Sequence, residues 1–244
     1  MTSNKSPSEH ITHIIDVRGD FACYSRPELS AERYSYPCPT PSGARGIFDA
    51  IYFKPQFYWQ VDRIDLLTMP AYIALRRNEV GGKAPSDRTI ASWSKGTRQP
   101  QALMADSPDR RQQRQTMALR NPQFRLHAHI VPRPGHEGQQ KAFDEQFRRR
   151  AAAGKCAWQP YLGCREFVAF FELVNDPTGP PRPVELNQAV GWMLYDVFDL
   201  SQPNRPGAAK PSISVFHAEI RHGVLDVPPY DSDLVRKPGG RRAG

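Results

Sequence analysis

Short stretches of apolar residues, separated by polar or proline- and glycine-rich segments, recur along the chain and predict strands. Residues 56–67 alternate apolar and polar side chains for most of their length, as expected for a strand with one buried face. The other predicted strands cover residues 13–18, 72–80, 165–174, 190–200 and 213–225.

The middle of the chain predicts a loop followed by a hairpin. Residues 81–111 are polar and contain few apolar anchors, so we expect a mobile loop there. After it, residues 115–119 and 124–131 flank Asn121-Pro122, which is a turn signal. We expect these two stretches to pair as a β-hairpin.

Residues 34–55 are predicted to contain a short helix that ends at a tyrosine and a lysine. Three prolines favour an extended entry to this helix, and Ser42 is its expected N-cap. Its apolar face comes from the residues spaced i, i+1, i+4 and i+5, namely Ile47, Phe48, Ile51 and Tyr52. Pro55 ends the helix and leaves Tyr52 and Lys54 at its last turn.

A second helix is predicted over residues 139–153, where Phe143 and Phe147 lie four residues apart and Gly154 marks the end. With the insertions set aside, the elements up to residue 175 follow the order β-α-β-β-α-β. That order is typical of ferredoxin-like domains, including many that bind RNA. The predicted fold class is therefore α+β, as a modified ferredoxin-like (RRM-like) domain with an added β-hairpin and a small C-terminal antiparallel β region.

The predicted organisation has four parts: a disordered leader over residues 1–12, a ferredoxin-like domain over 13–183, an antiparallel β region over 184–235 and a disordered basic tail over 236–244. The leader lacks the apolar core of a signal peptide, and no apolar run is long enough to span a bilayer. The four cysteines show neither CxxC nor zinc-site spacing, so reduced thiols are expected. We therefore predict a cytoplasmic protein that has no membrane contact.

The charge of the chain favours an anionic partner. Lys and Arg number 33 against 25 acidic residues, which gives a net charge of +8. Between Arg110 and Lys155 there are eleven basic and three acidic residues. Nucleic acid is the first candidate partner, although a solvated basic face fits equally well. Residues 81–83 lack the flanking residues of a phosphate-binding loop, which argues against a nucleoside triphosphatase.

His127 and His129 lie two residues apart on a predicted strand, so both side chains are expected on one face. Three interpretations stay open for them: metal ligation, contact with phosphate or ribose, and plain packing. Since no third ligand lies nearby in the sequence, no metal site and no cofactor are predicted. His136 lies in a loop, where it is either functional or simply solvated.

Tyr52 is the candidate catalytic residue. Metal-free RNA cleavage uses the ribose 2′-hydroxyl as nucleophile, and it needs a base, cations near the phosphate and a proton for the leaving 5′-oxygen. A cation beside a tyrosine favours its phenolate form. The candidate cations are Lys54, Lys141, Arg148, Arg149 and Arg150. The alternative interpretations are a core tyrosine and, for the arginine run, a solvated helix face.

Several sequence blocks together resemble one known family. The blocks are YPCPTPSGARGI at residues 36–47, AIYFKP at 50–55, RRNE at 76–79, PYLGCREF at 160–167 and GWMLYD at 191–196. They resemble the d-type branch of the fifth Cas family, which are CRISPR-associated proteins of subtype I-C. The resemblance runs from about residue 14 to about residue 227.

The resemblance implies an endoribonuclease that cuts precursor CRISPR RNA at the base of each repeat hairpin without metal. The enzyme then stays on the 5′ handle of the mature crRNA, together with the other subunits of the interference complex. The catalytic tyrosine of the family corresponds to Tyr52. The adjacent Lys-His pair of the family is not intact here: Lys141 is the only candidate lysine, and His136 or the His127/His129 face is the candidate substitute for the histidine.

The resemblance and the missing Lys-His pair leave two candidate functions. The first is the endoribonuclease, with Tyr52, Lys141 and His136 as catalytic residues; the second is a handle-binding scaffold with little or no cleavage, which the missing pair favours. Double-stranded DNA is a further candidate partner, because contacts to backbone charge carry little sequence information. The predicted RNA-binding residues are Arg26, Arg45, Lys54, Arg76, Arg77, His127, His129, Arg148, Arg149 and Arg150.

Overall fold

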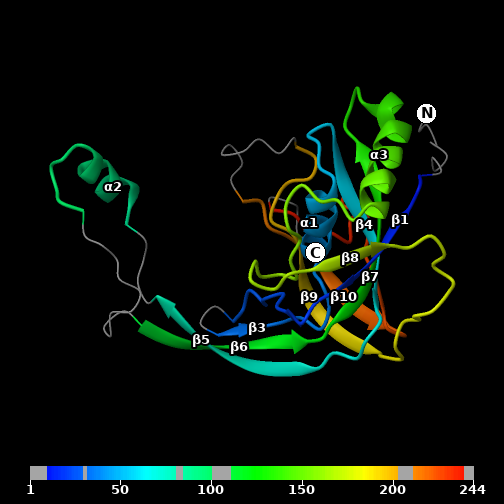
Figure 1. The fold of residues 1–244 in the computed structure, drawn as a ribbon, viewed down its shortest axis with the longest axis horizontal. Coiled ribbons are helices and arrows are strands. Elements are labelled where there is room, and N and C mark those ends of the chain that lie inside the picture. Colours follow the sequence, from blue (N-terminus) through cyan, green and yellow to red (C-terminus); the bar gives the residue numbers. More distant parts are fainter. Residues whose placement is uncertain (1–9, 30–31, 81–84, 101–110, 203–210, 239–244) are drawn as a thin grey trace.

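The structure, a computed structural model, describes residues 10–29, 32–80, 85–100, 111–202 and 211–238 (Figure 1). It is an α+β protein built mostly from antiparallel strands, with few helices in the described residues. The elements in chain order are β1 (His13–Arg18), β2 (Phe21–Ala22), β3 (Arg33–Tyr34), α1 (Pro41–Ile51), β4 (Phe57–Leu66), β5 (Tyr72–Val80), α2 (Asp87–Ser94), β6 (Arg111–Arg120), β7 (Gln123–Pro132), the 3₁₀ turn η1 (Glu137–Gln139), α3 (Gln140–Ala152), β8 (Phe170–Leu173), β9 (Gln188–Asp196), β10 (Ser214–Arg221) and β11 (Val224–Asp226).

The body of the molecule is a seven-stranded sheet in the order β8-β1-β7-β4-β11-β10-β9. Helices α1 and α3 pack together on one face of it, and an aromatic cluster forms the junction. The Trp59 ring of β4 lies 4.9 Å from that of Phe48 on α1 and 4.7 Å from that of Phe147 on α3, measured between centroids. All three side chains are fully buried, so this junction is the centre of the core.

The second sheet forms an arm. Strands β5 and β6 pair antiparallel along their whole length, from Tyr72 opposite Leu119 to Val80 opposite Arg111. The short strands β2 and β3 also pair with β6, near its C-terminal end. Figure 1 shows this hairpin extending away from the body, with α2 beyond its far end. The strand predicted at residues 72–80 is confirmed as β5.

The hairpin predicted around Asn121-Pro122 is wrong. Both flanking strands exist, but β6 pairs with β5 in the arm and β7 pairs with β1 and β4 in the body. Asn121 has φ 48°, and the left-handed residue redirects the chain from one sheet into the other. A turn signal therefore located the ends of the strands without identifying their partners.

The loop predicted over residues 81–111 contains helix α2 in its described part. Ser86 caps this helix by accepting a hydrogen bond from the Thr89 backbone N–H at 3.3 Å. Helix α2 buries none of its residues, so it contributes nothing to the core of the described structure.

Helix α1 begins one residue before the predicted cap. The Thr40 hydroxyl, not that of Ser42, accepts a hydrogen bond from the Gly43 N–H at 3.1 Å. Pro41 occupies the first helical position, where its missing N–H costs no helical bond. The predicted apolar face is confirmed, because Ile47, Phe48 and Ile51 are buried.

The predicted strands after α3 are shorter than expected. Only Phe170–Leu173 of residues 165–174 is a strand, because residues 161–168 form a tight loop in which the Leu162 N–H donates to the Phe167 carbonyl at 2.8 Å. Residues 213–225 contain two strands, β10 and β11, joined by a turn at His222 and Gly223, both with positive φ.

The ends of the described chain pack against the sheet. His10, in the predicted leader, stacks on His129, while residues 1–9 lie outside the described residues. Arg236 exchanges two backbone hydrogen bonds with Val215, so the predicted disorder of the tail is wrong for residues 236–238, and residues 239–244 lie outside the described part. Strand β11 pairs with β4, which joins the C-terminal strands to the sheet of the first part. In the described parts of the chain, no helix is both long and apolar enough to cross a membrane.

Candidate active site

Tyr52 lies at the C-cap of α1, as the sequence predicts, but its ring is mostly buried. The residue is only 7% exposed, and its ring packs 5.4 Å from the Phe57 ring, centroid to centroid. The Tyr52 carbonyl accepts a hydrogen bond from Trp59 Nε1 at 3.0 Å, which fixes the backbone at the end of the helix. This burial favours the alternative interpretation of Tyr52 as a core tyrosine.

The Tyr52 hydroxyl differs from a fully enclosed one. Among the described residues, the Tyr24 hydroxyl is enclosed and has no hydrogen-bond partner. The Tyr52 hydroxyl is not enclosed in this way. No hydrogen bond joins the Tyr52 hydroxyl to any described residue. The ring is thus held by packing, while its hydroxyl keeps a free hydrogen-bonding capacity at the edge of the core.

Two cations lie beside Tyr52. The exposed Lys54 places its ammonium 5.9 Å from the centroid of the Tyr52 ring and 5.6 Å from that of Phe143 on α3. Arg150, near the end of α3, donates from Nε to the Ile51 carbonyl at 2.6 Å. A guanidinium is favourable there because the last carbonyls of a helix carry partial negative charge. Positive charge therefore lies near the end of α1 from two directions, with Lys54 beside the first turn of α3 and Arg150 in its last turn.

The other residues of the predicted catalytic group lie further out. The Lys141 side chain is 87% exposed and lies 4.0 Å from Glu145. His136 is half-buried in the turn before η1, and its Nδ1 lies 3.5 Å from Gln139 Nε2. Within the described residues, neither side chain forms a hydrogen bond or ion pair with Tyr52. Arg148 and Arg149 are exposed on α3, and Arg149 donates to Gln146.

Arg45 is held inside the protein. Its guanidinium is bound by Asp196 of β9, with Nε donating at 2.7 Å and Nη2 at 3.1 Å, and by Asp49 one turn further along α1. The residue is only 8% exposed. Burial raises the pKa of the Asp49 carboxyl to about 6, although Arg45 acts to lower it. Arg45 therefore links α1 to β9. It is not exposed, as a residue that contacts RNA would have to be.

Three predicted RNA-binding arginines lie at or near the arm. Arg26 stacks over the Tyr36 ring at 4.5 Å from its centroid. Arg76 is exposed on β5, and the neighbouring Arg77 pairs with Glu166. These residues form a second basic area that is distinct in sequence and structure from the ends of α1 and α3.

His127 and His129 alternate along β7 with Leu126, Ala128 and Ile130, which are buried toward the helices. Alternation places both histidines on the opposite face, as predicted. Each meets a carboxylate of β4: His127 Nε2 lies 3.1 Å from Asp65 Oδ2, and His129 Nδ1 lies 2.8 Å from Asp62 Oδ2.

The sequence alone did not reveal these carboxylate partners. The sequence did show that Asp62 and Asp65 lie inside a predicted strand. Which side chains they meet depends on the register of β4 against β7, which the sequence does not show. A cavity of about 490 Å³ beside the first half of α1 was also not foreseen. Its walls include Thr40, Ser42, Asp49, Trp158 and Phe198.

We expect Asp65 to stabilise the fold in a pH-dependent way. Burial acts to raise the pKa of its carboxyl, but hydrogen bonds from His127 and Arg63 together hold it below the ordinary value of 3.8. The stabilisation is therefore complete above that value and is lost as the pH falls through the lower pKa of the folded state. Asp65→Asn should cost about 1–3 kcal/mol near neutral pH and progressively less below about pH 4.

Urea unfolding of the wild type and Asp65→Asn, between about pH 7 and pH 2, measures this difference. Asp233→Asn is the matched control, because Asp233 is exposed and should change stability by no more than about 0.5 kcal/mol. A cost for Asp65→Asn that stays constant down to the lowest pH contradicts the assignment.

Comparison with known proteins identifies similar chains along most of the sequence. Residues 14–228 match the Cas_Cas5d family model, described as "CRISPR-associated protein (Cas_Cas5)". A protein of Mannheimia succiniciproducens, named "CRISPR pre-crRNA endoribonuclease Cas5d", is 35% identical over 91% of this chain and 97% of its own length. A protein of Thermus thermophilus with the same name is 37% identical over 88% of this chain and 90% of its own.

A solved structure titled "Crystal Structure of CRISPR-associated Protein" shares the fold. Its TM-score is 0.61 at 17% identity, and the alignment covers 93% of this chain and 97% of that one. At this identity the likeness concerns the fold alone.

Proposed function

Because the chain belongs to the Cas5d family of CRISPR-associated proteins, we propose that it is an endoribonuclease that cleaves precursor CRISPR RNA at the base of the repeat hairpin. After cleavage it stays bound to the 5′ handle, as a subunit of a subtype I-C interference complex. The observation that carries this proposal is the 35–37% identity, over about nine-tenths of the chain, to two proteins named for that activity.

The proposed reaction needs no metal. The 2′-oxygen forms a bond to the adjacent phosphorus, the bond from phosphorus to the 5′-oxygen breaks, and the products are a 2′,3′-cyclic phosphate and a 5′-hydroxyl. One proton leaves the 2′-hydroxyl and one joins the 5′-oxygen. We assign the first transfer to Tyr52, whose hydroxyl has no partner among the described residues. His136 is assigned the second transfer.

Positive charge must stabilise the phosphorane-like transition state. Lys54 and Arg150 support this role by position, because both lie beside Tyr52. Lys141 is assigned the same role on bound RNA, since its exposed side chain is free to reorient toward a phosphate. The arginines near the arm, Arg76 above all, are proposed to hold the RNA outside the reacting centre.

The finer description of the fold is also a proposal. The elements β1-α1-β4-β7-α3-β8 follow the β-α-β-β-α-β order, and their strands lie in the spatial order β8-β1-β7-β4. Both features support a modified ferredoxin-like domain over residues 13–183, extended by the C-terminal strands over 184–235. The net charge of +8 supports an additional, sequence-independent affinity for double-stranded DNA.

One alternative has observations in its favour. The Tyr52 side chain is mostly buried, and among the described residues Lys141 and His136 form no hydrogen bond or ion pair with it. A handle-binding subunit that cleaves slowly or not at all needs only the basic surfaces, so these observations favour the scaffold function as the second candidate.

Incubation of the purified protein with its repeat hairpin RNA in EDTA tests the proposal. We expect one cut at the hairpin base and a product that carries a cyclic phosphate. The matched control is the same RNA with a 2′-deoxynucleotide before the scissile phosphate, which should bind equally and stay intact because its nucleophile is missing. Tight binding of both RNAs without any cut supports the scaffold, and cleavage that depends on added metal contradicts the proposed chemistry.

A further inference from the structure

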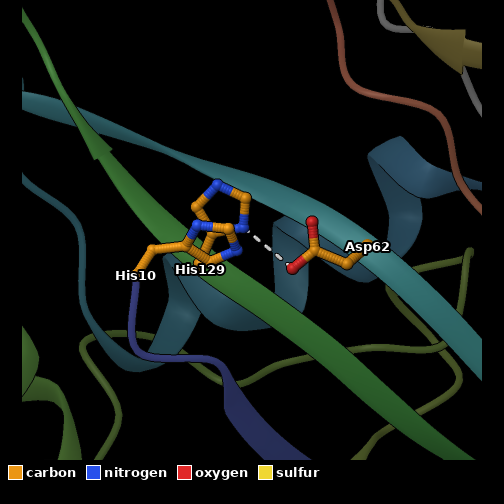
Figure 2. Close-up of side chains that lie close together, drawn as sticks. All are labelled: His10, Asp62 and His129. Carbon is orange, nitrogen blue, oxygen red and sulfur yellow. Dashed lines mark hydrogen bonds and ion pairs between the residues drawn. The ribbon is translucent and has the colours of Figure 1, made fainter. Parts of the chain in front are cut away.

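Three side chains from separate parts of the chain converge on the sheet face that is opposite the helices. The His10 and His129 rings stack with centroids 3.8 Å apart and planes at 26°, and His129 Nδ1 lies 2.8 Å from Asp62 Oδ2. Figure 2 shows both rings beside the carboxylate. One potential ligand atom from each residue lies within 4.8 Å of the other two.

Two residues of this cluster lie in paired strands, and the third lies outside any strand. The pairing of β4 with β7 shifts register between Val61 and Arg63, so Asp62 sits at a β-bulge, a feature that re-aims a side chain. The Asp62 carbonyl also accepts the Val227 N–H at 2.9 Å, which anchors the bulge. His129 lies within β7, whereas His10 is exposed and precedes β1.

The ligand set selects a class of ion. Imidazole nitrogens suit Zn²⁺ and its transition-metal neighbours, whereas Mg²⁺ and Ca²⁺ prefer oxygen ligands. Two histidines and one carboxylate are also a known three-ligand set for zinc, which leaves one position for water. Tetrahedral zinc with bonds of about 2.0–2.1 Å needs ligand atoms about 3.4 Å apart. Stacked, nearly parallel rings direct their nitrogen lone pairs side by side, so the exposed His10 ring has to rotate out of the stack to direct a nitrogen at the same ion as His129.

We propose that His10, Asp62 and His129 bind one Zn²⁺ ion, which fastens the segment before β1 to the β4–β7 pair. Among the described residues, this is the one group of three or more metal-ligating side chains in such proximity. The pairs His127–Asp65 and His222–Glu185 each offer a single imidazole and a carboxylate. The site uses neither Tyr52 nor its neighbouring cations, so the inference is independent of the proposed function.

Calorimetric titration of the metal-stripped, full-length protein with ZnCl₂ tests this site, without a polyhistidine tag and with the accessible cysteines alkylated, since Cys23 and Cys38 are buried. We expect one Zn²⁺ per chain and no comparable binding of Mg²⁺. His10→Gln and Asp62→Asn should each weaken the affinity roughly tenfold or more, since each removes a ligand. At a zinc concentration about 100 times the dissociation constant, the wild-type midpoint of thermal unfolding should rise by about 5–10 °C.

His222→Gln is the matched control, because it removes an exposed histidine that also pairs with a carboxylate. It should leave the affinity and the thermal shift unchanged. The visible spectrum of the Co²⁺ protein should show tetrahedral coordination that His10→Gln abolishes. Absence of zinc binding, or binding that His10→Gln and Asp62→Asn leave intact, overturns the proposal and leaves a stacked, hydrogen-bonded histidine pair.

Discussion

Tyr52→Phe is expected to lower the single-turnover rate of repeat RNA cleavage by about 10²–10⁴-fold, the range that a positioned general base contributes. The substitution removes only the hydroxyl and keeps the ring that packs against Phe57. Because the hydroxyl has no hydrogen-bond partner among the described residues, its loss leaves no buried group unpaired. Stability and affinity for the handle should therefore stay close to those of the wild type.

The rate is measured with excess enzyme in EDTA, and RNA affinity is measured by filter binding on the 2′-deoxy substrate. Tyr24→Phe is the matched control, since the Tyr24 hydroxyl is enclosed without a partner and its ring lies beside Gly43, in the first turn of α1, whereas Tyr52 caps the other end of that helix. Equal cleavage rates for Tyr52→Phe and the wild type would show that Tyr52 is a packing residue. In that case the family activity depends on another base, and His136 is the next candidate.

The helix that carries Tyr52 could be predicted because its determinants are local. The apolar spacing of Ile47, Phe48 and Ile51 and the flanking prolines lie within one short stretch. The burial of the Tyr52 ring could not be predicted in the same way. It depends on Phe57, which begins the next strand, and on how the end of α3 meets that of α1, and neither follows from helical spacing.

Pairing between strands was the weakest part of the sequence prediction. Alternation located β4 to within a residue at each end and found β5, yet the turn at Asn121 suggested a hairpin that does not form. A two-residue turn looks the same whether the chain folds back or crosses into another sheet. Which partner a strand takes is decided by side chains far along the sequence.

The same reason explains why the histidine cluster was not predicted. His127 and His129 were placed on one face correctly, but their partners come from β4 and from the segment before β1. The bulge at Asp62 changes the register by one residue, and no pattern in the sequence predicts it. Long-range register, in addition to composition, therefore determines the candidate metal site.

Arg45→Met should destabilise the protein by about 3–5 kcal/mol, the cost of breaking a buried ion pair by removing one partner. Asp196 is 1% exposed and Asp49 lies beside it in the same buried network, so both carboxylates would lose their shared cation. Methionine fills a similar volume, which limits the loss to electrostatics and hydrogen bonds.

The dependence on pH separates this cause from a simple packing defect. Burial already raises the pKa of Asp49 to about 6 against the opposing effect of Arg45, so removing Arg45 should raise it further. A carboxyl with a raised pKa binds protons in the folded state that the unfolded state has released, so stability falls as the pH rises. The deficit of Arg45→Met should therefore be larger near pH 8 than near pH 5.

Urea unfolding at both pH values measures the deficit, with Arg148→Met as the matched control on an exposed face. The control should change stability by no more than about 0.5 kcal/mol at either pH. If Arg45→Met were equally mild but weakened RNA binding, the guanidinium would have to leave its two carboxylates to meet the RNA. The predicted RNA-binding role of Arg45 would then be restored, and α1 would have to move relative to β9 when the handle binds.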